Sequence, residues 1–417
     1  MKRILRKVAS IFIATAMVAA MGVSAFAAPI GDDGIKEGNT LGDPIDTSIT
    51  LYKGLKFYNP DETSIQAPNI SYSYTIAAGD ADKRITDDQG VSVLTKAGVN
   101  ANSVTINSSA VAWTDADTVT ASSGGAEDIK AFTLDFANVT FSAAGVYRYV
   151  ITETPNPGDP ATAGVTRVTG YETTRYLDVY VKEDNNTFII YGFVCFANQL
   201  GHMDDKNDKN VAQAVKTKGF VDAKDSGDPY TADAYYTYNV TVGKTLVNDT
   251  EHNDNKFPFT VTFSNSTITQ NIKLSSDISG TADLQAELAS ASINGLESTA
   301  NIAHGATVKY IGIPCGTTVD VFETNNVSTA AYTSECDNAD TTAAEKVISL
   351  NEDSNTASVV CPANAAGTSK TVTFTNTLAL ISPTGVAMAI LPFVILLGFG
   401  IGFMVLGTTK RKEEYEV

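Results

Sequence analysis

Apolar side chains recur at every second position along most of the chain, in short runs separated by polar turns. The alternation is clearest at residues 176–181 and 257–263. A period of two is that of a β-strand with one buried face, and between the two ends the chain shows almost no helical period. The polar turn 183–186, followed by the apolar run 188–193, further predicts a β-hairpin. The pattern therefore predicts an all-β fold built from antiparallel strands.

Two segments rich in Gly, Asp and Pro interrupt this pattern. Residues 28–45 have the composition of a flexible lead-in, and residues 224–229 form a second break. A chain of 417 residues also exceeds the usual size of a single domain. We therefore predict two tandem β-sandwich domains, one over residues 46–228 and one over residues 229–381.

The two ends of the chain have a different character. Four basic residues precede an uncharged apolar run and a small-residue triplet, which predicts a secretory signal peptide over residues 1–27. Residues 386–406 carry no charge and would span about 30 Å as a helix, and a basic cluster follows them at 410–412. This predicts a transmembrane segment with a cytoplasmic tail, residues 407–417; a buried core helix is the alternative for the apolar segment.

Composition and charge narrow the classes of function. The hydrophobic fraction of 43% is enough for packed cores and excludes wholesale disorder. The net charge is 29 − 47 = −18, and because such a chain is repelled by phosphate backbones, a nucleic-acid partner is excluded. The four cysteines are too few for a disulfide scaffold, although an exported chain could hold a bridge, for which Cys336 and Cys361 are the candidate pair.

Each predicted domain opens and closes with a strand that carries a polar residue on its apolar face. Because side chains alternate along a strand, a residue two positions past an inward apolar residue also points inward. By this rule both domains turn a Lys, a Glu and an Asp or Asn toward the interior, in the same order: Lys53, Glu153 and Asp222 in the first, and Lys244, Glu323 and Asn376 in the second.

Buried side chains of these types can react with one another. Desolvation lowers the pKa of a lysine and raises that of a carboxyl group, so a neutral amine and a protonated acid can coexist. The amine can attack the side-chain carbonyl of Asn or Asp while the Glu passes a proton to the leaving group, ammonia or, for Asp222, water. Glu153 and Glu323 would act once per molecule, so no turnover enzyme is predicted. The alternative is a Lys–Glu ion pair at the rim, with the Asn capping a strand end.

The segments around these residues resemble the Gram-positive major pilins. They are residues 50–53, 145–153 and 171–176 in the first domain and 240–244, 313–323 and 373–377 in the second. The resemblance implies two immunoglobulin-like sandwiches of the collagen-adhesin B type, each cross-linked by a Lys–Asn isopeptide bond. The chain departs from the family at residues 219–222, where Asp222 stands in place of the more usual Asn, and Asn198 is the rival partner of Lys53.

A second motif lies just before the apolar C-terminal segment. Residues 381–385 end in Pro383-Thr384-Gly385 and are similar to sorting signals of the Leu-Pro-x-Thr-Gly kind, from which the first two residues depart. The resemblance implies that a sortase cleaves after Thr384 and passes it to an amine. The family keeps its acceptor lysine near the end of the first domain, where Lys218 and Lys216 are the candidates; otherwise both are solvated surface lysines.

Together these features predict the shaft subunit of a sortase-assembled pilus, anchored to the cell wall of a Gram-positive surface. The implied partners are a sortase, neighbouring pilin subunits, peptidoglycan and, as a further candidate, a host surface ligand; no cofactor and no metal are implied. The alternatives are a monomeric wall-anchored adhesin and a surface glycoside hydrolase. The chain has three histidines and neither a His-Glu-x-x-His nor a Gly-x-Ser-x-Gly motif. Residues 201–210 resemble a calcium loop but lack its closing Glu.

Overall fold

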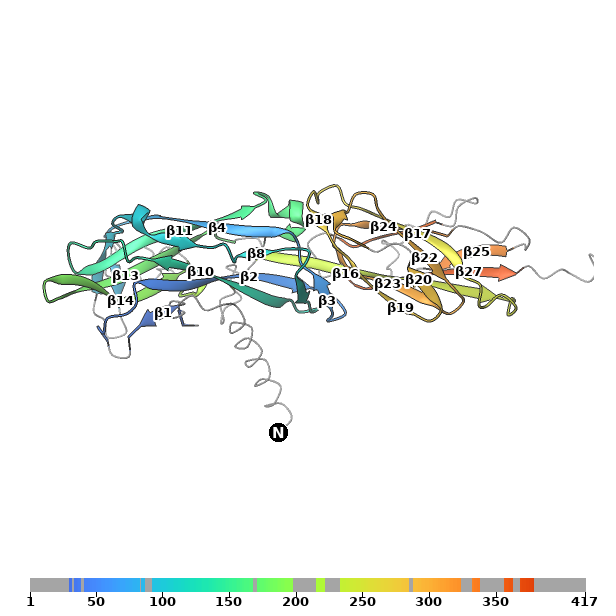
Figure 1. The fold of residues 1–417 in the computed structure, drawn as a ribbon, viewed down its shortest axis with the longest axis horizontal. Coiled ribbons are helices and arrows are strands. Elements are labelled where there is room, and N and C mark those ends of the chain that lie inside the picture. Colours follow the sequence, from blue (N-terminus) through green and yellow to red (C-terminus); the bar gives the residue numbers. More distant parts are fainter. Residues whose placement is uncertain are drawn as a thin grey trace, which may run out of the picture.

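The structure is a computed structural model that describes residues 30–31, 34–38, 41–82, 84–86, 92–167, 171–197, 215–221, 233–284, 288–323, 332–337, 356–362 and 368–378. Within these ranges every regular element is a β-strand except two short 3-10 helices, η2 (Ala101–Ser103) and η3 (Pro160–Ala163). The predicted all-β fold is therefore confirmed. Two β-sandwiches lie end to end in an elongated molecule (Figure 1).

The first sandwich packs an eight-stranded sheet against one part of a ten-stranded sheet. The eight-stranded sheet has the order β1-β14-β13-β11-β4-β8, and β5 and β6 join it through β11. Its strands are β1 (Ile35–Glu37), β4 (Ile70–Ala78), β5 (Arg84–Thr86), β6 (Ser92–Ala97), β8 (Ala112–Trp113), β11 (Gly145–Asn156), β13 (Thr174–Asp184) and β14 (Thr187–Phe196). The strands β13 and β14 are the hairpin expected from the alternation at 176–193.

The facing sheet of the first sandwich is centred on β2. It contains β2 (Ser48–Tyr58), β7 (Thr105–Asn107), β10 (Ala126–Asp135), β12 (Val165–Thr166), β15 (Gly219–Phe220) and the first residues of β16 (Asp233–Val247). A separate ribbon joins β3 (Ser64–Gln66) to β9 (Thr118–Thr120). Both β15 and β16 run parallel to β2, so the edge of β2 is filled by two strands in succession.

The second sandwich shares β16 with the first. On one face β16 pairs with β23 and β27, which extend to β19 and β25; the opposite sheet has the order β20-β22-β17-β24-β26. The strands are β17 (Phe257–Ser264), β18 (Asn271–Ile272), β19 (Ser275–Ser279), β20 (Ala282–Leu284), β21 (Ala291–Ser292), β22 (Leu296–Ile302), β23 (Thr307–Pro314), β24 (Thr318–Glu323), β25 (Tyr332–Asp337), β26 (Thr356–Val360) and β27 (Lys370–Leu378). The alternation predicted at 257–263 is present in β17, where every second side chain is buried.

The long strand β16 links the two sandwiches. Its first residues, from Asp233 to Tyr236, pair with β2, and its later residues pair with β23 and β27. The apolar core of the first sandwich extends to Tyr235 on this strand, and that of the second begins at Tyr238. In Figure 1 β16 runs as one ribbon from the first domain into the second. A continuous strand that contributes to both cores fixes the two domains relative to each other.

Polar side chains reinforce this junction. The carboxylate of Asp61 accepts hydrogen bonds from Lys309 Nζ at 2.5 Å and from Ser369 Oγ at 2.7 Å, both in the second domain. The amides of Asn59 and Asn239 bond to each other in both directions, at 3.0 and 2.9 Å, and both side chains are buried. Buried amides that satisfy one another hold a defined geometry, because separating them would leave polar groups without partners.

The beginning of the chain differs from the expected flexible lead-in. Residues Ile35–Glu37 form β1 and pair with β14, and Ile30 is buried. The physical reason is that β14 would otherwise be an exposed sheet edge, which this short strand covers. The break expected at 224–229 lies outside the described residues.

No helix in the described ranges has the length and apolar character needed to cross a membrane. The segments predicted as signal peptide and transmembrane span lie outside these ranges.

Candidate functional site

Three ionisable side chains meet inside the first sandwich. Lys53 on β2 places its Nζ 3.2 Å from Glu153 Oε1 on β11 and 3.2 Å from Asp233 Oδ2 at the start of β16. All three side chains have 0% exposure. Because an isolated buried charge is costly, these groups must be compensated by one another and by their hydrogen bonds.

Three tyrosines surround this cluster and orient it. Tyr171 accepts a hydrogen bond from Lys53 Nζ at 2.8 Å and donates one to Glu153 Oε1 at 2.6 Å. Tyr72 donates to Asp233 Oδ2 at 2.7 Å, and Tyr74 donates to Glu153 Oε2 at 3.2 Å. Burial, followed by the nearby carboxylates, raises the pKa of all three phenols well above 10.0, so they remain donors.

Arg167 closes the open side of the cluster. Its guanidinium donates to both oxygens of Asp233, at 3.1 and 3.4 Å, and its side chain is 29% exposed. Burial would raise the pKa of Asp233, but the charges of Lys53 and Arg167 and the hydrogen bonds from Arg167 and Tyr72 outweigh it and lower that pKa below its ordinary value. Asp233 is therefore held as a carboxylate beside Lys53 Nζ.

The second sandwich contains a simpler cluster of the same kind. Lys244 Nζ on β16 donates to Glu323 Oε1 on β24 at 2.5 Å, and Asn376 Nδ2 on β27 donates to the same oxygen at 3.0 Å. Lys244, Glu323 and Asn376 are all at most 1% exposed. The lysine Nζ lies 4.5 Å from the centre of the Phe257 ring, so its surroundings are largely apolar.

This environment prepares the amine for reaction. Burial lowers the pKa of Lys244 to about 8, although its contact with Glu323 opposes the shift. A substantial fraction of the amine is then neutral near neutral pH, and a neutral amine is a nucleophile. Within the described part of the chain, Glu323 Oε2 has no hydrogen-bond partner.

The two clusters obey one rule of strand register. In the first domain Asp233 pairs with Leu55, two residues past Lys53 on the parallel strand β2. In the second, Asn376 pairs with Leu246, two residues past Lys244 on the parallel strand β16. A spacing of two puts each acceptor on the same face as its lysine. The same geometry therefore occurs twice, once with Asp and once with Asn.

This arrangement is suited to forming an amide between side chains. In the second domain the Glu323 oxygen touches both the attacking nitrogen of Lys244 and the amide nitrogen of Asn376, so it can take a proton from the first and give one to the second. The new bond would join Lys244 Nζ to the Asn376 side-chain carbonyl carbon, and ammonia would leave. In the first domain Glu153 Oε1 also contacts Lys53 Nζ, so Glu153 could take a proton from this nitrogen as it attacks the side-chain carboxyl carbon of Asp233, and one water would leave.

The structure places five of the six predicted cross-link residues in these clusters: Lys53, Glu153, Lys244, Glu323 and Asn376. The sixth, Asp222, lies outside the described residues, as does its rival Asn198. The register position that Asp222 would need, opposite Leu55, is occupied by Asp233. The strand β15 ends at Phe220, and β16 takes over the edge of β2.

Asp233 is the residue that sequence reasoning missed. It opens a long strand that the sequence pattern places wholly in the second domain, so the pattern offers it no role in the first. A signal existed: Asp233 precedes a run of alternating residues that leads directly to Lys244.

The remaining candidates are the linkage lysines, the sorting residues and the calcium-like loop. Lys216 is exposed, and Lys218 Nζ lies 5.7 Å from the centre of the Tyr52 ring. The candidate sorting residues Pro383, Thr384 and Gly385 and the loop 201–210 lie outside the described residues. Among the residues described, no group of acidic, His and Cys side chains has the geometry of a metal site.

The candidate cysteine pair is not brought together. The backbone of Cys336 on β25 pairs with Phe374, whereas the carbonyl of Cys361 accepts a hydrogen bond from Gly316 N at 2.8 Å. The sulfur of Cys361 instead lies 3.1 Å from that of Cys315.

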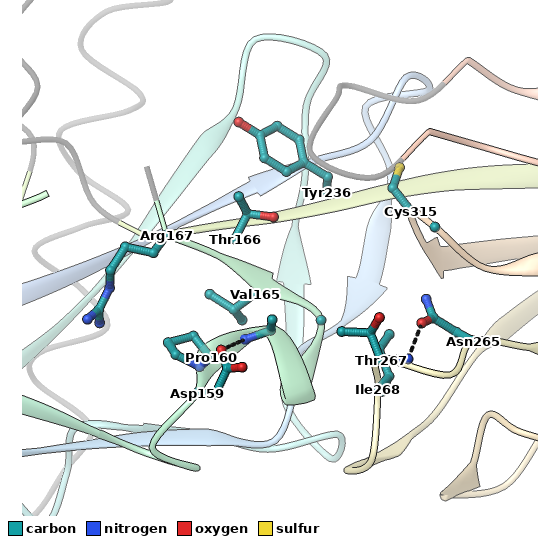
Figure 2. A pocket seen from close by; sticks show the side chains of 13 residues that line it. Asp159, Pro160, Val165, Thr166, Arg167, Tyr236, Asn265, Thr267, Ile268 and Cys315 are labelled. Atoms are coloured by element: carbon teal, nitrogen blue, oxygen red, sulfur yellow. Dashed lines mark hydrogen bonds between the residues drawn. The ribbon is translucent and has the colours of Figure 1, made fainter. Parts of the chain in front are cut away.

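A cavity of about 400 Å³ lies at the junction of the two domains. Its wall includes Asp159 and Arg167 from the first domain and Asn265 and Cys315 from the second, as Figure 2 shows. Three of these polar groups already have partners: Asp159 accepts from Ala161 N at 3.0 Å in capping η3, Arg167 binds Asp233, and Asn265 donates to Thr317 Oγ1. The cavity does not contain the nucleophile, Glu or acceptor of either cluster.

Two family models match parts of the chain. Residues 51–200 match the family model of the Spy0128-like isopeptide containing domain, and residues 238–378 match that of a domain of unknown function, DUF7601. No curated protein sequence matches the chain.

Among solved structures, the chain is similar to the major pilin protein T3.2 from Streptococcus pyogenes serotype GAS13637, with 19% identity over 83% of this chain and 100% of that chain and a TM-score of 0.42. It is also similar to the major pilin from Streptococcus pyogenes, with 16% identity over 79% of this chain and 99% of that chain and a TM-score of 0.40. A pilus-presented adhesin, Spy0125, shows 14% identity over 49% of this chain and 37% of that chain, with a TM-score of 0.23.

Proposed function

We propose that the chain is the shaft subunit of a covalently assembled surface pilus, and the match of residues 51–200 to the family model of the Spy0128-like isopeptide containing domain supports this proposal. Each of its domains closes one internal isopeptide bond, Lys53–Asp233 in the first and Lys244–Asn376 in the second. The observation that carries the proposal is the repeated buried cluster, in which a lysine and its acceptor recur in one register on parallel strands and a glutamate from the opposite sheet contacts the lysine.

The placement of the two bonds suits a load-bearing fibre. Asp233 and Lys244 lie on the same strand, β16, so the end of the first bond and the start of the second are 244 − 233 = 11 residues apart. Tension that arrives at Asp233 follows β16 to Lys244, crosses to Asn376 and continues toward residue 384. The 376 − 244 = 132 residues that the second bond spans are bypassed. A covalent route of this kind lets the second domain carry load without unfolding.

Assembly would use the C-terminal motif. A sortase would cleave after Thr384 and transfer it to a lysine of the next subunit, for which we favour Lys218. This lysine precedes β15, whose Phe220 pairs with Lys53, so the entering load reaches the first domain beside its cross-link. A head-to-tail contact of this type does not close and propagates as a filament. The last subunit would be joined to peptidoglycan, which places the fibre at the cell surface.

The internal bonds are tested by peptide mapping of the full-length chain made without a sortase. We expect one cross-linked peptide pair joining Lys53 to Asp233, lighter than its linear parts by about 18 Da, and one joining Lys244 to Asn376, lighter by about 17 Da. Glu153→Gln should remove the first pair alone and Glu323→Gln the second alone. Glu297→Gln, at an exposed position on β22, is the control and should leave both. Unmodified peptides containing Lys53 and Lys244 in the wild type would refute the bonds.

Polymerisation is tested separately with the sortase of the same cells. A ladder of covalent oligomers that disappears in Lys218→Arg and persists in Lys216→Arg supports a shaft subunit. A single wall-linked species would favour the monomeric adhesin.

A further inference from the structure

We infer that Cys315 and Cys361 form a disulfide at the end of the second domain that lies next to the first. The two sulfur atoms are 3.1 Å apart, one at the turn that follows β23 and the other just past the end of β26. These strands belong to the two opposing sheets of the sandwich. The bridge would therefore join the sheets directly, and it would close a loop of 46 residues.

The backbone already holds the two cysteines side by side. Cys315 N donates to Tyr236 O on β16 at 2.9 Å, and the next residue, Gly316, donates to the carbonyl of Cys361 at 2.8 Å. Gly316 has a φ of +83°, a left-handed conformation that glycine adopts without strain and that lets the turn bring the two sheets together. The pair is thus positioned before any bond forms.

The turn is anchored on its other side as well. Thr317 is fully buried; its carbonyl accepts from Tyr238 OH at 2.8 Å and its Oγ1 accepts from Asn265 Nδ2 at 3.2 Å. These hydrogen bonds hold the residue two positions from Cys315 in place. The packed turn therefore keeps the Cys315 sulfur close to that of Cys361. To form the bridge the two sulfur atoms close from 3.1 Å to the disulfide bond length of about 2.05 Å.

The strand register separates Cys336 from this pair. Cys336 pairs with Phe374, which pairs with Lys244, whereas Cys315 is bonded to Tyr236. Tyr236 and Lys244 are eight residues apart on one extended strand, or about 26 Å, several times the reach of a disulfide. A bridge between Cys361 and Cys336 would require the sheet to be dismantled.

The oxidation itself is a thiol–disulfide exchange. A disulfide of an exported oxidoreductase, or oxidised glutathione, accepts two electrons and the two thiol protons, and becomes two thiols as the Cys315–Cys361 bond forms. Cys315 is partly exposed and lines the junction cavity, so it is the sulfur that the oxidant reaches first (Figure 2). Cys361 is 1% exposed and would act as the resolving thiol.

The bridge has a role different from that of the isopeptide bond. Both cysteines lie inside the segment that the Lys244–Asn376 bond bypasses, so the disulfide carries no axial load. It holds β26, the last strand in the order of its sheet, to the turn beside the first domain. The setting of this inference, an oxidising exterior, rests on the proposed export of the chain, but the pairing itself rests on the geometry alone.

The pairing is tested by counting reactive cysteines in the folded full-length chain after equilibration with a mixture of oxidised and reduced glutathione, followed by denaturation and alkylation. We expect two of the four cysteines to be labelled, and all four after reduction. The variants Cys315→Ser and Cys361→Ser should each show three labelled cysteines. Cys195→Ser and Cys336→Ser are the matched controls. Each should show one labelled cysteine, because each leaves the bridge intact. Burial raises the pKa of the Cys195 thiol to about 12, which keeps this thiol unreactive in the folded chain.

Four labelled cysteines in the oxidised wild type would overturn the inference, and so would three in Cys336→Ser, which would assign the bridge to Cys336. The use of glutathione keeps this result independent of whether the chain is exported. The isopeptide-linked peptides are read in the same samples after reduction, so a failure of the disulfide and a failure of the proposed function are seen separately.

Discussion

The mechanical consequence of the two cross-links can be measured by pulling the full-length chain between handles at its ends. In the wild type, the residues between Lys53 and Asp233 and those between Lys244 and Asn376 are spanned by covalent bonds. Neither domain should then lengthen the molecule, however large the force. Only the segments outside the two bonds can extend.

Glu323→Gln keeps the shape of the side chain but removes the acid that moves the proton between Lys244 and Asn376. Without the second bond, unfolding of the second domain releases 376 − 244 = 132 residues. An extended chain spans about 3.3–3.6 Å per residue, so the expected gain in contour length is about 440–480 Å. Glu153→Gln releases the 180 residues between Lys53 and Asp233, or about 590–650 Å. Because these two lengths differ, each variant identifies its own bond.

The assay is single-molecule force spectroscopy in the presence of a reductant, which excludes any contribution from a disulfide. In oxidised Glu323→Gln the bridge between Cys315 and Cys361 should shorten the gain by its 46 residues, or about 150–170 Å. Glu297→Gln should behave as the wild type. If the wild type itself lengthened by either large step, the chain would contain no bond at that site, and the load path described above would be wrong.

Three further predictions concern the chemistry of the clusters. Asp233→Ala should abolish the cross-link of the first domain and, because the closed loop is lost, lower the free energy of unfolding of that domain by about 5 kcal/mol. Asp222→Ala should leave both the cross-link and the stability unchanged. Peptide mapping and thermal unfolding decide between the two aspartates. Asn376→Ala leaves Lys244 as an amine whose folded pKa of about 8 lies below its ordinary 10.5, so folding releases a proton and stability should rise with pH, by about 2 kcal/mol between pH 8 and 9.5. The same unfolding measurement in Asn376→Ala with Lys244→Met should show no such rise, and a flat profile in both would contradict the lowered pKa. Tyr171→Phe removes the phenol between Lys53 and Glu153, so bond formation during refolding should slow about tenfold in the first domain and not in the second; equal rates in mass-spectrometric time courses would show that the phenol plays no part.

The sequence alone determined the elements of the cross-link chemistry that lie within single strands. Lys244, Glu323 and Asn376 each sit two positions past a buried apolar residue, and the strict alternation of a β-strand leaves only one face for them. The same rule located Lys53 and Glu153. These inferences need no knowledge of which strands are neighbours, because the period of a strand is a local property of its backbone.

Which residues meet across the sheets was decided by the tertiary structure. Asp233 lies opposite Leu55 because β16 runs from the second domain to the edge of β2, and Cys361 meets Cys315 because a turn joins the two sheets at the junction. Both pairings join residues from different elements, and Asp233 and Lys53 are 180 residues apart. Alternation along a strand fixes the face of each side chain but not its neighbour, since strand order and register follow from how the whole chain buries its apolar surface and satisfies its backbone hydrogen bonds.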